Sequence, residues 1–314
     1  MSRAGKPSRR DVVAGIGTLS LGPMLGAFPV RAAMAPYRTR VGAIEAIVIS
    51  DGTLNVPLAF TLPETPPEEA RTLLVAHGLP PDGMPSQTNV TLVKTGSETV
   101  LIDAGSGANF QATAGKLGEN LEAAGIDPAS VTKIVFTHAH ADHLWGAIDD
   151  FDEERFPQAS YVISAEEYDF WIDPDTINKM PDVFKGMASG SARILKRLAG
   201  KMERRKAGDT VAPGLTYVDT RGHTPGHMAV MVEQGREQLL VVGDVLTHPA
   251  VSFARPDWRM GADTDRDLGA ATRRKLLDRL SSDRTPFVGF HLPWPGHGAI
   301  ERFQTGYRYV PRGL

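Results

Sequence analysis

The chain has 314 residues, of which 41% are hydrophobic and none is cysteine. This length and hydrophobic content suffice for one large domain with its own core, and the missing cysteine excludes disulfide bonds, thiolate metal ligands and a lipid-modified cysteine within this sequence. The 34 Lys and Arg against 37 Asp and Glu give a formal net charge of −3, which argues against a nucleic-acid substrate because phosphate contacts need an excess of basic side chains.

The first 35 residues differ in composition from the rest of the chain. The pair Arg9-Arg10 precedes an apolar stretch over residues 12–28 that glycines and a proline interrupt. Ala33-Met34-Ala35 then offers small side chains at the spacing that a signal peptidase requires. This pattern resembles a twin-arginine export signal. We therefore predict a signal peptide over residues 1–35 that the twin-arginine export machinery recognises, and a mature domain over residues 36–314 that is periplasmic or secreted.

Hydrophobic periodicity divides the rest of the chain into strands and helices. The predicted strands cover residues 43–50, 89–94, 98–103, 133–136, 161–163, 215–219, 228–233, 238–242 and 286–290. The predicted helices cover residues 117–124, 165–171, 177–201 and 267–280, the third interrupted near residues 188–190 and the last with an apolar side made of Leu268, Leu276, Leu277 and Leu280. Strands followed by helices in two successive halves predict an α/β (α+β) fold, a four-layer αββα sandwich.

A dense group of metal-binding side chains follows the strand predicted at residues 133–136. His138, His140, Asp142 and His143 fall within six residues of one another. In an extended loop His138 and His140 can point toward one cation, while Asp142 and His143 offer an oxygen and a nitrogen to a second position. Imidazole and carboxylate are ligands that suit Zn²⁺ and its first-row neighbours. The sequence therefore predicts a metal site here.

The His-x-His-x-Asp-His pattern resembles the signature of the metallo-β-lactamase superfamily. Three later positions fit the further ligands of that superfamily: His223, Asp244 and His291 each follow a predicted strand or apolar run. Asp103, in Asp-Ala-Gly, is a further hallmark outside the ligand set. The resemblance implies the metallo-β-lactamase sandwich fold and two metals, with one bound by His138, His140 and His223, the other by Asp142, His143 and His291, and with Asp244 as the bridge.

This ligand set leaves out His227, His248 and His297. The resemblance implies that His227 supports the site from outside the ligand set. His248 follows Asp244 closely and could either line the cleft or have a structural role. His297 competes with His291 for the last ligand position, and we favour His291 because it directly follows an apolar run.

Within the superfamily the closest resemblance is to methyl parathion hydrolase-like enzymes. Segments 169–171, 184–189 and 291–296 carry it. It implies that Phe110, Trp171 and Phe184 form an aromatic pocket for the leaving group, although each could equally be a core residue. The expected substrate is a neutral ester-type small molecule: an aryl ester, a lactone or an organophosphate triester.

The expected reaction is attack by a metal-bridging hydroxide held with Asp142 and Asp244. The cofactors would be two divalent metal ions, Zn²⁺ in first place, with Mn²⁺, Fe²⁺ or Co²⁺ as alternatives. The missing tyrosine soon after Asp244 disfavours a dedicated acyl-homoserine lactonase, and the missing cysteine disfavours several β-lactamase subclasses. A mononuclear iron oxidoreductase of the persulfide dioxygenase type remains the alternative enzyme, with a non-catalytic metal-binding scaffold as a third possibility. The oligomeric state stays open, a homodimer being one option.

Overall fold

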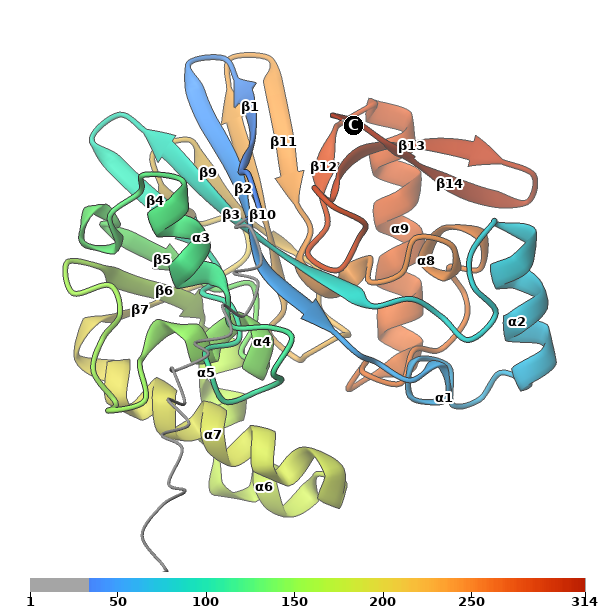
Figure 1. Ribbon diagram of the computed structural model, residues 1–314, viewed down its shortest axis with the longest axis horizontal. Coiled ribbons are helices and arrows are strands. Elements are labelled where there is room, and N and C mark those ends of the chain that lie inside the picture. The colour runs from blue at the N-terminus through green and yellow to red at the C-terminus, as the bar shows by residue number, and fades with distance from the viewer. Residues whose placement is uncertain (1–33, 314) are drawn as a thin grey trace, which may run out of the picture. The chain divides into compact units, whose positions relative to one another are not determined.

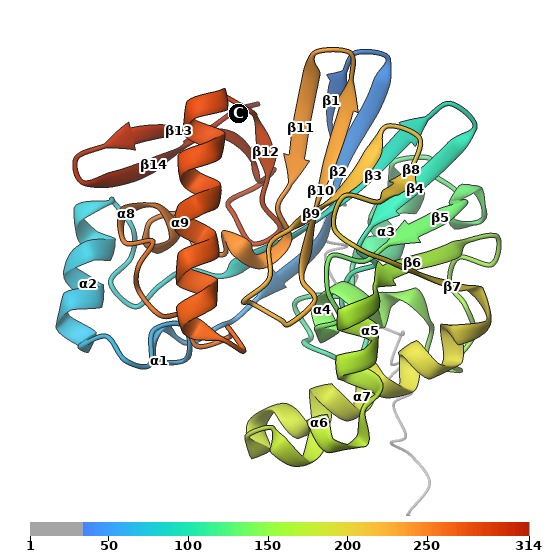
Figure 2. The ribbon, with the colours of Figure 1, turned by 180° about the vertical axis from the view of Figure 1, so that it is seen from behind.

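The structure is a computed structural model that describes residues 34–313, which lie within one compact unit of the chain. These residues form two seven-stranded sheets that face each other, with helices on the outer sides (Figure 1, Figure 2). The first sheet follows chain order: β1 (Tyr37–Val41), β2 (Ile44–Leu54), β3 (Ser86–Thr95), β4 (Glu98–Ile102), β5 (Lys133–Val135), β6 (Ser160–Ser164) and β7 (Met202–Arg205). The second sheet has the order β14 (Gly306–Pro311), β13 (His297–Phe303), β12 (Phe287–Val288), β11 (Glu237–Val241), β10 (Met228–Gln234), β9 (Leu215–Asp219) and β8 (Thr210–Ala212).

Helices cover the outer face of each sheet. They are α1 (Leu58–Thr61), α2 (Pro67–Ala76), α3 (Leu117–Ala123), α4 (Ala141–Leu144), α5 (Ala165–Ile172), α6 (Pro174–Lys179), α7 (Asp182–Leu198), α8 (Val251–Ala254) and α9 (Arg266–Asp283). Buried side chains of α3, α5 and α7 pack in one cluster with the first sheet, and those of α9 pack in another with the second sheet. The predicted four-layer αββα sandwich is therefore confirmed.

Alternation along the strands explains why both faces of each sheet are apolar. In β2, Ile47 packs beneath the helices of the first sheet, while the next residue, Val48, faces the second sheet. In β10, Val230 faces the first sheet and Met231 packs with α9. Because successive strand residues point to opposite faces, continuous apolar runs such as these fit strands that are covered on both sides.

Two expectations about the helices were wrong. The predicted interruption near residues 188–190 does not exist, since α7 runs through them and the break lies at Met180-Pro181, where proline cannot continue a helix. Gly190 serves close packing instead, because a β-carbon there would overlap the ring of Trp145. Leu268 does not belong to the apolar side of α9, as it is 44% exposed whereas the other three leucines are buried.

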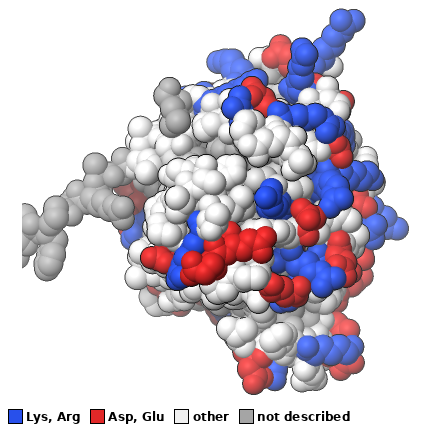
Figure 3. Space-filling model, turned by 90° about the vertical axis from the view of Figure 1, so that its right-hand side faces the viewer, with Lys and Arg blue, Asp and Glu red and all other residues white. Residues whose placement is uncertain are grey.

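The sequence patterns missed five strands at or near the sheet edges: β1, β7, β8, β13 and β14. In all of these strands except β8, which has only three residues, charged side chains hide the alternation because they form ion pairs at the surface rather than pointing into a core. Glu301 of β13, for example, pairs with Arg308 of β14 at 2.6 Å. Basic and acidic side chains are interspersed on the face seen in Figure 3.

The predicted export signal lies outside the described residues, except for Met34 and Ala35. None of the helices between residues 34 and 313 combines the length and the apolar character that a membrane span requires.

Two glycines of α7 provide a test of this packing. Gly190→Ala should lower the free energy of unfolding by about 1–3 kcal/mol, because the added methyl group overlaps the Trp145 ring. Gly186→Ala is the matched control on the same helix: no atom lies within 4 Å of its β-carbon position, so alanine should stabilise the helix by up to about 1 kcal/mol. Denaturant unfolding of the two variants measures both effects, and equal effects would contradict this account of Gly190.

Candidate metal centre

The seven predicted ligand side chains come together at one edge of the two sheets. The loop after β5 carries four of them, and α4 begins within it; His223 follows β9, Asp244 follows β11 and His291 follows β12. Their ligand atoms form two groups, each with all atoms within 4.8 Å of one another: His138, His140, His223 and Asp244 in the first cluster, and Asp142, His143 and His291 in the second. The side chains that the resemblance assigns to each metal position thus lie in one cluster each.

Asp244 lies between the two clusters. Its Oδ1 is 3.2 Å from Nε2 of His143, and its Oδ2 is 3.1 Å from Nε2 of His291 and 3.3 Å from Nε2 of His223. One carboxylate therefore approaches histidines of both clusters, which is the position that a bridging ligand needs. Asp142 reaches only the second cluster, with its Oδ2 3.2 Å from His291 Nε2.

Three buried polar atoms of the site have no hydrogen-bond partner among residues 34–313: Nε2 of His138, Nε2 of His143 and Oδ1 of Asp244. Buried polar atoms normally have a hydrogen-bond partner, so three such atoms without one in the same place indicate that a further group binds there. The last two atoms lie 3.2 Å apart without forming a hydrogen bond, as two ligands of one cation would. Imidazole nitrogen and carboxylate oxygen are donors that fit first-row divalent cations, so the residues present fit a metal.

The electrostatics divide the histidines into two kinds. Burial lowers the pKa of His138 well below its usual value and that of His140 to about 3, because a charged imidazole is poorly solvated there. Burial also lowers the pKa of His143 and His291, but Asp244 and the neighbouring carboxylates outweigh it. They raise the pKa of His143 well above its usual value and that of His291 to about 10. Binding of a cation would have to displace these protons.

Asp103 and His227 hold the site from outside the two clusters. Asp103 accepts the backbone N–H of Thr137 at 2.7 Å, and its other oxygen is 2.8 Å from Nδ1 of His143. It adopts a left-handed φ of 63°, which directs its carboxylate back under the loop. His227 accepts the backbone N–H of Asp244 on Nε2 at 3.0 Å, which agrees with the predicted supporting role.

Glu167 is a supporting residue that the sequence did not reveal. It is fully buried in α5 and binds two of the ligand loops. Oε1 accepts the N–H of Ala139 at 3.0 Å, and Oε2 accepts the hydroxyl of Thr224 at 2.7 Å and the N–H of Gly226 at 2.9 Å. Glu166 next to it is partly exposed, and nothing local distinguishes the two glutamates. Asp263, 3.0 Å from Nδ1 of His223, was also missed.

A cavity of about 380 Å³ opens onto the clusters. Phe110 and Phe184 line it, as predicted for a substrate pocket. Trp171 does not, and the prediction for it is corrected: its side chain is 0% exposed, donates to Oε1 of Glu167 at 2.6 Å and packs edge-on against the ring of His140. An aromatic residue in a helix can face the core as readily as a cleft, and the sequence could not separate the two.

His248 and His297 take different places. His248 lines the cavity and also accepts the backbone N–H groups of Ala250 and Val251 on Nδ1, so it combines the two roles that the sequence left open. His297 lies in β13 with Nδ1 2.8 Å from the hydroxyl of Tyr37 and belongs to neither cluster. Of the two competitors, His291 is therefore the one that the fold brings to the other ligands.

Comparison with known proteins gives consistent results. The family model described as "Metallo-beta-lactamase superfamily" matches residues 83–291, well over half of the chain. AidC, described as a dizinc quorum-quenching lactonase, aligns with 89% of this chain and 98% of its own at a TM-score of 0.84 and 28% identity. AbOPH, described as a hydrolase in the beta lactamase superfamily, aligns with 90% of this chain and 99% of its own at a TM-score of 0.83 and 26% identity. A probable metallo-hydrolase of Mycobacterium tuberculosis is 28% identical over 182 residues, or 51% of this chain, and this chain spans only 57% of its length.

Proposed function

This chain belongs to the metallo-beta-lactamase superfamily, and from that premise we propose that it is a dinuclear metal-dependent hydrolase of neutral, ester-type small molecules. The observation that carries the proposal is the meeting of two metal-binding clusters, joined at Asp244, at the end of an apolar cavity. A bound pair of divalent cations would supply Lewis acidity and lower the pKa of water, the chemistry that ester hydrolysis requires. AidC, to which this structure is similar, is described as a dizinc lactonase, which favours zinc.

The proposed roles follow from where the side chains lie. The first cluster and the second cluster each hold one cation, with Asp244 reaching both. Asp142 and Asp244 line the cavity and so face the reacting ester, whereas Asp103, Glu167 and His227 act only by holding the ligands in place.

The cavity wall supports a neutral substrate. Among its lining residues, all within the described part of the chain, there is no lysine or arginine, and the only carboxylates are Asp142 and Asp244. The wall away from the clusters is largely apolar, and includes Leu54, Val56, Leu58, Phe60, Met84, Phe110, Val183, Phe184, Met187 and Met260. A substrate with its own carboxylate or phosphate would find no cation other than the metals, whereas an aryl or alkyl group would replace water along this wall.

Aryl esters, lactones and organophosphate triesters all satisfy these conditions. The resemblance to methyl parathion hydrolase-like enzymes favours an aryl leaving group, and Phe110 and Phe184 line the cavity accordingly. The similarity to AidC favours a lactone, although the tyrosine that dedicated lactonases carry after the bridging aspartate is missing after Asp244. None of the relatives described above is an oxidoreductase, so that alternative gains no support. We also propose that residues 1–35 are a twin-arginine-type export signal and that the mature protein is periplasmic or secreted.

The proposal is tested by measuring metal content together with turnover of three substrate sets: aryl esters, lactones and aryl phosphotriesters. We expect two divalent metals per chain and activity on at least one set that is lost on chelation and restored by adding metal. Purified protein that holds fewer than two metals after incubation with zinc, or that hydrolyses none of the three sets, would overturn it.

Phe184→Ala should reduce kcat/KM for aryl substrates about ten- to two-hundred-fold more than for small alkyl ones, because truncating a buried aromatic contact costs about 1–3 kcal/mol of discrimination. Metal content should not change. Phe151→Ala is the matched control, since Phe151 is 85% exposed and does not line the cavity. Equal losses on aryl and alkyl substrates would remove Phe184 from the pocket.

A further inference from the structure

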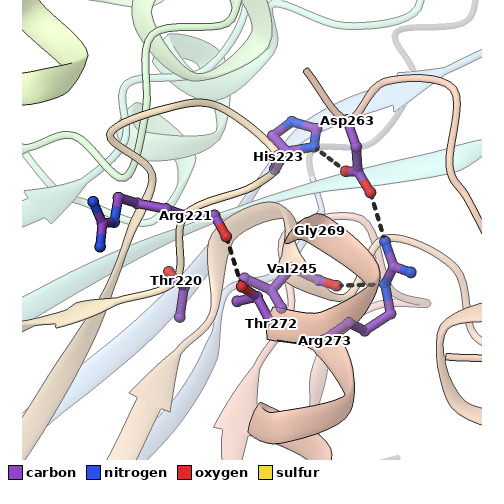
Figure 4. Close-up of a pocket in the computed structure, with 8 residues that line it drawn as sticks. All are labelled: Thr220, Arg221, His223, Val245, Asp263, Gly269, Thr272 and Arg273. Carbon is purple, nitrogen blue, oxygen red and sulfur yellow. Dashed lines mark hydrogen bonds and ion pairs between the residues drawn. The ribbon is translucent and has the colours of Figure 1, made fainter. Parts of the chain in front are cut away.

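His223 lies where the loop after β9 meets helix α9 (Figure 4). Gly222 permits this approach, because a β-carbon there would overlap the backbone of Gly269. Two further bonds fix the loop: the N–H of Thr264 donates to the carbonyl of His223 at 2.9 Å, and the hydroxyl of Thr272 donates to the carbonyl of Arg221 at 2.7 Å. The position of His223 is thus set by α9 and the residues that lead into it.

A buried ion pair stands directly behind His223. Figure 4 shows Asp263 between the imidazole and the guanidinium of Arg273. Oδ1 of Asp263 is 3.0 Å from Nδ1 of His223, and Oδ2 accepts a hydrogen bond from Arg273 at 2.8 Å. The two charged side chains are only 1% and 2% exposed. Since a buried ion pair often contributes little net stability, its presence here calls for another reason.

Arg273 also reaches the segment that carries Asp244. Its Nε donates to the carbonyl of Val245, the residue after Asp244, at 3.1 Å. Its Nη1 donates to the carbonyls of Pro256 and Trp258, both at 3.0 Å. One rigid guanidinium therefore holds the surroundings of two members of the first cluster, His223 through Asp263 and Asp244 through Val245.

The second cluster is held by other groups. Nδ1 of His143 lies against Asp103, and Nδ1 of His291 is 2.8 Å from the backbone carbonyl of Gln87. Neither His143 nor His291 is hydrogen-bonded to the Asp263–Arg273 pair. The two metal positions thus have separate supports, which differ in chemistry as well as in place.

We propose that Asp263 and Arg273 are positioning residues chiefly for one metal position, that of His138, His140 and His223. Asp263 accepts the Nδ1 proton of His223, which leaves the Nε2 lone pair free for the cation, and Arg273 fixes the direction of the Asp263 carboxylate. This inference rests on the proposed dinuclear centre. The Asp263–Arg273 ion pair then has a function beyond any contribution to folding stability.

The experiment measures zinc affinity by chelator competition in two backgrounds, each with a single intact cluster. In His291→Ala protein, which keeps the first cluster, Arg273→Met should weaken zinc binding about 10- to 100-fold. In His223→Ala protein, which keeps the second cluster, the same change should weaken zinc binding much less, because it affects that cluster only through the contact with Val245 beside Asp244. Asp103→Asn is the matched control and should show the opposite preference, weakening zinc more in the His223→Ala background, because Asp103 contacts His143 directly and reaches His138 only through Thr137.

A second variant separates positioning from stability. Asp263→Leu combined with Arg273→Met replaces the ion pair by apolar side chains of similar size and should recover the part of the thermal stability of the metal-free protein that Arg273→Met loses by leaving Asp263 buried without its counter-charge. Zinc affinity of the first cluster should stay weak in the double variant. Recovery of zinc affinity together with stability, or equal weakening in both backgrounds, would overturn the inference. Failure of the unaltered protein to bind zinc would instead overturn the proposed function.

Discussion

Replacing Asp244 by alanine is expected to lower hydrolytic activity by several orders of magnitude and to remove at least one metal per chain. Asp244 is the carboxylate whose two oxygens approach histidines of both clusters, so its loss weakens both metal positions at once. The substitution also removes a negative charge from among the four buried histidines that surround Asp244. In the unaltered protein this charge favours the charged form of His143 and His291. Metal analysis and kcat/KM on the best substrate of the panel check both effects.

His291→Ala and His297→Ala give the contrast for this prediction. His291 belongs to the second cluster, so its loss should weaken one metal and spare the other. His297 bonds to Tyr37 in β13, outside both clusters, so its loss should be mild. Near-native turnover with two metals in Asp244→Ala, or greater damage from His297→Ala than from His291→Ala, would show that the ligand assignment is wrong.

The second large effect is expected at Glu167. Glu167→Ala strands four buried donors, the N–H groups of Ala139 and Gly226, the hydroxyl of Thr224 and the indole N–H of Trp171. Each stranded donor costs about 1–3 kcal/mol, and domains have about 5–15 kcal/mol in total. We expect a melting temperature at least about 8 °C lower, together with looser metal binding because two ligand loops lose their common anchor.

Neighbouring variants make this test specific. Glu166→Ala removes the adjacent, partly exposed carboxylate and its surface ion pair with Arg221, and should change the free energy of unfolding by no more than about 1 kcal/mol. Glu167→Gln keeps one acceptor oxygen and should fall between the two. If Glu167→Ala melted like Glu166→Ala, the four hydrogen bonds would not have the importance given to them here.

The metal site could be predicted where its ligand side chains are close together in the sequence. His138, His140, Asp142 and His143 belong to one loop, and this pattern by itself indicates a metal. The aromatic pocket was predictable only in part: Phe110 and Phe184 line the cavity, whereas Trp171 packs in the core. A side chain's type gives its chemistry but not the direction in which its helix faces.

By itself, the sequence determined the layers of the fold and the kinds of metal ligand. Apolar runs at strand spacing require burial on both faces, and imidazole and carboxylate groups at strand ends meet wherever such strands share an edge. Only the tertiary structure decided which distant groups hold those ligands: Glu167 beneath two loops, and Asp263 with Arg273 behind His223. Each of these is a charged residue that looks exposed in a local pattern. The burial of each depends on partners that are distant in the sequence. Hydrophobic periodicity cannot reveal such hydrogen bonds, because they form only when the layers of the fold pack together.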